Sequence, residues 1–352
     1  MSELQVALLV IGLGVIVAVY VFGWWQQRRY HRKFGVAFKA DHVDALYQND
    51  PVDTLEQEDK SIQSEVVEES PKPALSNDPC ALLNARSDYI IELELAEPGP
   101  AAVLVGLWQR KFDFRKPVLV CGQTLHECEW ERVISESHTL YQRFRIALQM
   151  VDRGGLISEA KLVDFSDLVL GVAKNIKAQA SVPVTNDAYQ QAMGLDKFCA
   201  SVDQMVGLNL ELPQDRLIRA IDISQAAGLH GMNLESDGAF HLLDVQGHTL
   251  FSLINQDTVP FQHHTLETFS TSGITLLLDV PRVEDPTLRF DQMMEVAVDL
   301  AEGLKLNIVD DRRVPLDDVA LKKTREQVSG VEESMRENGI IPGSVQARRL
   351  FS

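Results

Sequence analysis

The chain has 352 residues, with 33 basic and 51 acidic side chains, and its formal net charge at neutral pH is −18. An acidic body of this kind repels nucleic-acid phosphates, which argues against DNA or RNA binding. Its four cysteines form no C-x-x-C pair of the kind that binds zinc or carries out dithiol chemistry, so we expect reduced thiols.

The N-terminus carries an apolar run from Leu4 to Trp25. A helix of this length reaches roughly 30 Å, the thickness of a bilayer's hydrocarbon layer, so residues 4–25 predict a transmembrane helix after a periplasmic tip at residues 1–3. The basic residues of the juxtamembrane segment 26–40 that set its topology are Arg28, Arg29, Arg32 and Lys33. Such a flank stays cytoplasmic, which predicts a single-pass membrane protein whose N-terminus lies outside the cytoplasm and whose C-terminal part lies inside it. The alternative, a buried core helix of a soluble protein, leaves the one-sided charge unexplained.

Residues 41–87 are rich in Asp and Glu and lack apolar periodicity. Such a composition cannot build a core, so we expect a disordered acidic linker that acts as a tether. An alternative concerns the start of this region, from Tyr30 to Tyr47. Because Phe34 and Phe38 are four residues apart beside basic residues, this stretch could lie as a short helix on the membrane surface.

Residues 88–195 predict a first α+β unit. A helix over 158–178 is indicated by Leu162, Phe165 and Val169, which share one helical face. The other predicted elements, in chain order, are a strand at 89–96, a helix at 101–112, strands at 117–122, 129–133 and 141–151, a short strand at 182–184 and a helix from Thr185.

Residues 196–338 repeat the same order of elements, and residues 339–352 read as a flexible tail. The predicted elements are a strand at 198–212, a helix at 216–227, a hairpin of strands 239–243 and 249–255, a strand at 274–280, a helix at 290–304, a strand at 306–309 and a helix at 316–338. The sequence therefore predicts an α+β protein with two units in series, either twin domains or one packed pair.

Motifs for enzymatic chemistry are absent from the sequence, which has no glycine-rich phosphate loop, no G-x-S-x-G and no H-E-x-x-H. The adjacent His263 and His264 point apart, so we interpret them, with His241 and His248, as polar surface and not as metal ligands. The run from Asp310 to Arg313 is interpreted as a strand cap with ion pairs. We expect no enzyme, cofactor, metal or small-molecule substrate.

One face of the second unit's strands is a candidate binding surface. If Ile274, Leu276 and Leu278 point to the helices, Thr275 and Leu277 point away from them. By the same alternation, the residues that join that outward face are Leu250, Ser252, Ile254, Ala239 and His241. A face that mixes apolar and small polar side chains predicts a shallow groove for an amphipathic peptide. The alternative is that the first unit covers it.

Three segments of the second unit resemble the ZipA family of bitopic bacterial division proteins. They are His-Thr-Leu-Phe-Ser-Leu-Ile-Asn at 248–255, Phe-Ser-Thr-Ser-Gly-Ile-Thr at 269–275 and Val-Asp-Asp-Arg-Arg at 309–313. The resemblance covers roughly residues 216–328 plus the N-terminal anchor. It implies a split βαβ domain whose open face binds the C-terminal tail of FtsZ, the tubulin-like division protein.

By position, the resemblance also implies which residues form the tail groove. They are Leu277, Ile254, Ala239, Gln256 and, from the first strand, Met205 or its neighbour Gln204, to which strand alternation adds Thr275 and Ser252. Gln256 and Ala239 replace larger apolar residues, Thr258 replaces a lysine and Ser272 a proline, so we expect weaker tail binding. The first unit, absent from short family members, looks like a diverged copy of the same fold.

The resemblance implies a non-enzymatic protein that tethers the FtsZ ring to the inner membrane and bundles its filaments. Each groove binds weakly, but a filament presents many tails, so avidity raises the total strength. The alternative is a membrane-tethered scaffold that binds another division or envelope protein through the first unit. A membrane-bound hydrolase is a remote third reading, because the sequence names no nucleophile with a base.

Overall fold

The computed structural model describes residue 80 and residues 83–125, 129–213, 216–257, 259–310 and 312–352. The predicted periplasmic tip, transmembrane helix and basic segment, and the linker up to residue 79, lie outside these residues. Within the described ranges, no helix combines the length and the apolar character that a membrane crossing requires.

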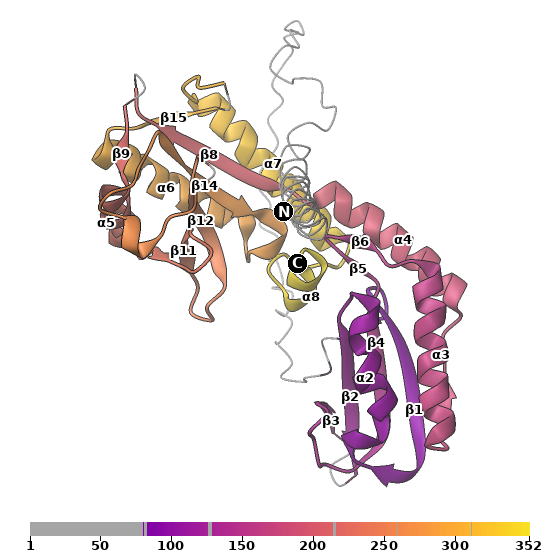
Figure 1. Ribbon diagram of the computed structural model, residues 1–352. Coiled ribbons are helices and arrows are strands. Elements are labelled where there is room, and N and C mark those ends of the chain that lie inside the picture. Colours follow the sequence, from indigo (N-terminus) through magenta and orange to yellow (C-terminus); the bar gives the residue numbers. More distant parts are fainter. Residues whose placement is uncertain (1–79, 81–82, 126–128, 214–215, 258, 311) are drawn as a thin grey trace, which may run out of the picture. The chain divides into compact units, whose positions relative to one another are not determined.

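The first unit is built on a five-stranded antiparallel sheet with the strand order β3-β2-β4-β1-β7, coloured indigo to magenta in Figure 1. Its elements are β1 (Asp88–Gly99), α2 (Val105–Arg110) between 3-10 turns η1 (Ala101–Leu104) and η2 (Lys111–Phe114), β2 (Val118–Thr124), β3 (Trp130–Arg132), β4 (Tyr141–Gln149), β5 (Val151–Asp152), β6 (Gly155–Leu156), α3 (Glu159–Asn175), β7 (Gln179–Ser181) and α4 (Thr185–Val202).

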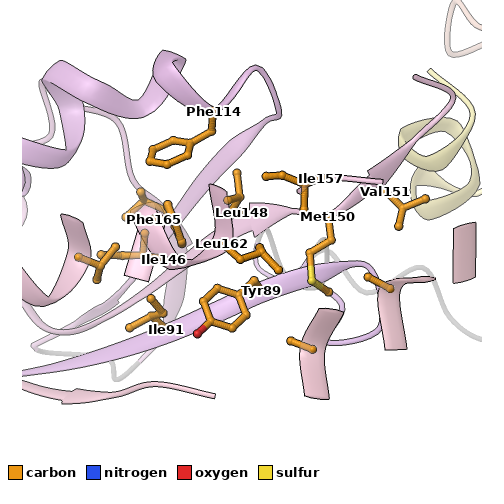
Figure 2. Packing of buried hydrophobic residues seen from close by; sticks show 14 of the residues in the cluster. Tyr89, Ile91, Phe114, Ile146, Leu148, Met150, Val151, Ile157, Leu162 and Phe165 are labelled. Atoms are coloured by element: carbon orange, nitrogen blue, oxygen red, sulfur yellow. The ribbon is translucent and has the colours of Figure 1, made fainter. Parts of the chain in front are cut away.

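Helix α3 packs on one face of this sheet and forms the first core, part of which Figure 2 shows. Alternate residues of a strand share a face, so Tyr89 and Ile91 on β1 and Ile146 on β4 all point toward the helix. Phe165 of α3 meets Phe114 edge-on, with ring centroids 5.2 Å apart. The predicted apolar face of this helix is therefore the face that the sheet buries.

The second unit has a six-stranded antiparallel sheet with the order β10-β11-β12-β14-β8-β15. Its elements are β8 (Met205–Glu211), β9 (Ile218–Arg219), α5 (Ala220–Leu229), β10 (Asn233–Leu234), β11 (Phe240–Leu243), β12 (Thr249–Asn255), η3 (His263–Thr265), β13 (Ser270–Thr271), β14 (Gly273–Asp279), η4 (Val280–Arg282), α6 (Pro286–Leu304), β15 (Asn307–Val309) and α7 (Asp318–Glu337). Strands β9 and β13 form a separate pair.

Apart from these short additions, both units follow the predicted order of strand, helix, three strands, helix, strand and helix, and the α+β class is confirmed. They differ in how the hairpin joins the sheet. In the first unit the earlier hairpin strand, β2, pairs with β4, whereas in the second unit the later one, β12, pairs with β14.

The chain between the two units differs from the prediction. Helix α4 continues to Val202, whereas we expected a strand from Phe198, and the predicted boundary between residues 195 and 196 falls inside this helix. The buried residues Leu195, Cys199 and Val202 are spaced four and three apart, which is the spacing of a helical face. A short apolar run is ambiguous between strand and helix, and here the helix is formed.

The expected flexible tail at residues 339–352 is wrong. These residues include helix α8 (Val345–Leu350), whose N-cap Ser344 accepts a hydrogen bond from the Ala347 amide at 3.1 Å. Leu350 and Phe351 are each 1% exposed and belong to the core of the first unit. Their partners lie far away in the sequence, so local periodicity could not reveal this packing.

The expectation of reduced cysteines is also wrong for one pair. Cys80 and Cys121 form a disulfide across a sequence separation of 41, with their Cα atoms 6.0 Å apart. The bond forms because Cys80, in the segment that precedes β1, lies against Cys121 of β2, and no spacing motif in the sequence indicates this contact. Cys199 is a free, buried thiol, and burial raises its pKa to about 12.

Candidate functional site

The second sheet has two chemically different faces. Ile274, Leu276 and Leu278 on β14 are 0% exposed and lie in the core with α6. The alternate residue Leu277 is only half-buried and lies on the opposite face. The predicted alternation of this strand is therefore present.

The strand register brings the outward residues into rows. Ser252 lies opposite Leu277, and Leu277 lies opposite Gly207 on β8. Gly207 has no side chain, and a Cβ placed there would meet Leu277 Cδ2 at 3.4 Å and Thr275 Cγ2 at 3.5 Å. The side chains of Leu277 and Thr275 therefore flank the position at which Gly207 carries no side chain.

A groove with a volume of about 390 Å³ lies over these rows. Five of the predicted residues line it, namely Met205, Ala239, Ser252, Ile254 and Leu277. Its lining also includes Leu250, Phe251 and Val283 and the polar residues Asp237, His241, Gly247, His248, Thr249, Asp279, Arg282 and Arg348. The groove is thus apolar along its floor and charged at its ends.

Two predicted residues do not line this groove. Gln256 donates from Nε2 to Glu211 Oε1 at 2.5 Å, across the sheet. Thr275 is 9% exposed, and its hydroxyl donates to Asn209 Oδ1 at 2.8 Å. Both side chains are held by polar partners on β8, so they support the sheet beyond the end of the apolar floor.

His241, which strand alternation places on the outward face, forms a polar wall of the groove. Its Nε2 lies 2.9 Å from Asp237 Oδ2, and its Nδ1 lies 2.9 Å from Ser252 Oγ. The His241–Ser252 contact follows from their being directly opposite in the β11–β12 register, a pairing the alternating hairpin pattern could have suggested. With the Nε2 proton donated to the carboxylate, Nδ1 accepts from the Ser252 hydroxyl.

This trio has the order of a nucleophile, base and acid set, but its setting differs. Ser252 is on a strand paired on both sides, so the surrounding backbone N–H groups belong to the sheet and form no oxyanion hole. Asp237 is largely exposed, with 60% of its side chain open to solvent. The network therefore fixes the shape and polarity of the groove wall.

The remaining candidate residues lie outside the groove lining. His263 and His264 lie on η3, outside the groove lining. Asp310 accepts hydrogen bonds from the backbone N–H groups of Arg312 and Val314, both at 2.8 Å, as a cap does. Across the part of the chain that the structure describes, no three His, Cys, Asp or Glu side chains gather as metal ligands would.

Arg153 of the first unit reaches Asp279 at one end of the groove. Its Nη1 and Nη2 donate to the two carboxylate oxygens, each at 2.9 Å, and its Nε donates to Asp203 Oδ1 at 3.1 Å. Burial opposes the charge of Arg153, but the hydrogen bonds to Asp279 and Asp203 outweigh it and raise its pKa. The guanidinium is therefore a permanent positive charge that engages both carboxylates.

Comparison with known proteins places this groove in a family. Residues 204–327 match the model described as "ZipA, C-terminal FtsZ-binding domain". The cell division protein ZipA of Colwellia psychrerythraea strain 34H is 24% identical over 168 residues, which cover 46% of this chain and 43% of that relative. The matched stretch thus spans less than half of the relative's length. The resemblance drawn from the three segments is confirmed: residues 204–327 are similar to the FtsZ-binding domain of the ZipA family.

Proposed function

We propose that the groove of the second unit binds the C-terminal tail of FtsZ and that the chain tethers FtsZ filaments to the inner membrane. The observation that carries the first half is the half-exposed apolar floor, formed by Leu277, Ile254 and Met205, within the region that matches an FtsZ-binding domain. Such a floor gains free energy when an apolar peptide side chain covers it, about 25 cal/mol per Å² of apolar surface buried.

The shape of the groove favours a short segment that lies across the strands. Its floor is formed by β8, β12 and β14, which contribute the apolar side chains of Met205, Ile254 and Leu277. A site of this size supports weak binding to a single tail. A filament that presents many tails to many anchored copies converts weak single contacts into strong attachment and cross-linking.

The membrane half of the proposal is supported by the sequence. The apolar run at residues 4–25 and the basic flank that follows favour a single span with the C-terminal units in the cytoplasm. The first unit, with the same order of elements, is proposed to be a diverged copy of the second. The protein acts in this proposal as a non-enzymatic division factor.

Titration of a fluorescent FtsZ tail peptide with the full chain tests the groove. Leu277→Asp or Ile254→Asp places a charge on the apolar floor, and we expect the affinity to fall by roughly 100-fold because the carboxylate must be desolvated. Leu170→Asp is the matched control, since Leu170 is 42% exposed on α3 and lies outside the groove. Unchanged affinity in both groove variants, with native circular dichroism, would reject the assigned face.

Two further measurements test the tether. The full chain in lipid vesicles should recruit FtsZ filaments, and removal of the final residues of FtsZ should stop recruitment. In cells, the chain should stay in the membrane pellet after alkaline carbonate extraction, as a spanning helix does. Extraction into the supernatant would reject the membrane span and would leave the proposal for the groove unaffected.

A further inference from the structure

Two arginines gather at the end of the groove where Asp279 and Met205 lie. Arg282 belongs to η4, directly after β14, and Arg348 belongs to α8. The family match ends at residue 327, so Arg348 comes from a part of the chain outside it. The C-terminal helix thus adds a charged group to the groove that the matched domain does not contain.

The charge balance at this end is positive. Arg153 occupies both carboxylate oxygens of Asp279 at 2.9 Å, while Arg282 Nη1 lies 4.0 Å from the same carboxylate. Arg348 donates from Nη1 to the Gly343 carbonyl, a neutral acceptor. Three guanidinium groups therefore face two carboxylates, those of Asp279 and Asp203, in a chain whose net charge is −18.

We propose that Arg282 and Arg348 form a carboxylate-binding end of the groove, which fixes the direction of the bound FtsZ tail. This inference rests on the proposed function and names the chemistry that the groove recognises at one end. A guanidinium offers five N–H donors in a planar fork that matches a carboxylate, and Arg282 is 44% exposed. The ligand is either an acidic side chain of the tail or its C-terminal carboxylate.

Arg153 has a positioning role in this arrangement. By holding both oxygens of Asp279, it keeps that carboxylate from pairing closely with Arg282 and from repelling an acidic ligand. The first unit would thereby take part in tail recognition without touching the tail.

The test titrates the FtsZ tail peptide as the free acid, as the C-terminal amide, and with its acidic residues replaced by their amides. Arg282→Gln and Arg348→Gln should each weaken binding of the free acid by roughly three- to tenfold and flatten its salt dependence. Arg348→Lys, which keeps the charge but loses the fork, should fall between Arg348→Gln and the unchanged chain. Arg132→Gln, an exposed arginine on β3, is the control.

The peptide variants identify the source of the carboxylate. The peptide that lacks the recognised carboxylate should bind the unchanged chain more weakly, and the arginine variants should then cause no further loss, as a double-mutant cycle requires. Loss of coupling with the amidated terminus assigns the terminal carboxylate, and loss with the amide-substituted side chains assigns an acidic residue.

Arg153→Gln and Asp203→Asn distinguish the positioning of Asp279 by Arg153 from a general stabilising effect of the Arg153 ion pairs. Arg153→Gln releases Asp279 toward Arg282 and should weaken tail binding severalfold. Asp203→Asn removes the other carboxylate but leaves Arg153 on Asp279, so binding should not weaken.

Three outcomes decide against the proposals. If Arg282→Gln and Arg348→Gln bind the free acid like the unchanged chain while Leu277→Asp abolishes binding, the carboxylate site is overturned and the tail groove stands. If Leu277→Asp and Ile254→Asp leave affinity unchanged, or if the unchanged chain does not bind the tail, the groove and the carboxylate site are overturned together.

Discussion

The two sheets share an order of elements but present different free faces. On the first sheet, the face opposite the core carries cross-strand ion pairs, Arg145 with Glu92 at 2.8 Å and Arg143 with Glu94 at 3.0 Å. The guanidinium of Arg145 also lies 4.1 Å from the ring centroid of Trp130. On the second sheet, the row of Ser252, Leu277 and Gly207 contains no charge.

The difference teaches what a peptide would gain on each face. A ligand on the first face would have to displace ion pairs that already satisfy one another, whereas a ligand on the second would cover half-exposed apolar surface such as that of Leu277. Cys121 adds to this contrast, because it lies opposite Arg145 in the β2–β4 register and is bonded to Cys80. The first face is therefore occupied by the chain's own groups.

The largest expected effect tests whether the first unit needs the chain's end. Phe351→Ala should destabilise that unit by about 3–5 kcal/mol, since it empties a buried aromatic site. The four tryptophans are Trp24, Trp25, Trp108 and Trp130, so a background with Trp24→Phe and Trp25→Phe leaves only emission from the first unit. Urea unfolding followed by this fluorescence measures the loss. Val345→Ala, at a side chain 41% exposed on α8, should change little.

A second test breaks the disulfide bond of the first unit. Reduction of the bond between Cys80 and Cys121 should lower the unfolding free energy by up to about 4 kcal/mol, the chain-entropy value for a loop of this length. Urea unfolding with and without dithiothreitol measures it, and Cys199→Ala should respond to the reductant in the same way. Tail affinity should stay constant, and a parallel loss of tail binding would contradict the division of roles between the two faces.

A third test adds a side chain beside Leu277 on the second sheet. Gly207→Val should weaken tail binding about tenfold, because its methyl groups crowd Leu277 and Thr275 on the outward face, while strand stability should hold or rise. Gly171→Ala is the control, since a Cβ there meets nothing within 4 Å and α3 gains about 1 kcal/mol. Equal affinity for Gly207→Val and the unchanged chain would show that the tail does not contact the surface around Gly207.

The smallest expected effect concerns acid sensitivity of the second unit. Burial would raise the pKa of Glu332, but hydrogen bonds from Thr287 and Arg336 outweigh it and lower the pKa below its usual 4.5. A depressed pKa in the folded state contributes stability above that value, which is lost as the pH falls through the folded pKa. Glu332→Gln should remove about 1 kcal/mol of this contribution at pH 7 and leave a flatter acid limb. An unchanged acid limb would contradict this assignment.

Strand alternation predicted much of the second unit from the sequence. The hairpin at β11 and β12 and the faces of β14 follow from period-two patterns, and five of the seven groove residues line one groove. The resemblance placed Gln256 in the groove and strand alternation placed Thr275 there, but both side chains form hydrogen bonds to β8 and neither lines the groove. The residues that were missed, Arg153 and Arg348, reach the groove from distant segments, and no local pattern reports such a contact.

The predicted flexible tail failed for the same physical reason. Leu350 and Phe351 are too few to form a periodic stripe, and their burial depends on a surface built more than 150 residues earlier in the chain. The disulfide likewise depends on where a single residue before β1 lies. The local sequence indicates where helices and strands form, whereas these contacts form only when helices and strands that are distant in the sequence pack together.

The end of the chain is clasped to the start of its folded part. Arg349 donates to the Asp88 carboxylate at 3.1 Å through Nη1, Arg86 Nη1 donates to the Asn338 carbonyl at 2.6 Å, and Gln149 donates to the Arg349 carbonyl at 2.9 Å. A pulling force applied through the residues that precede β1 would therefore act first on these hydrogen bonds between the start of the first unit and the C-terminal segment. A circular permutant in which a linker joins Ser352 to residues 83–86, and which opens at the exposed Gly247 turn, should keep both cores, because these two segments already contact each other.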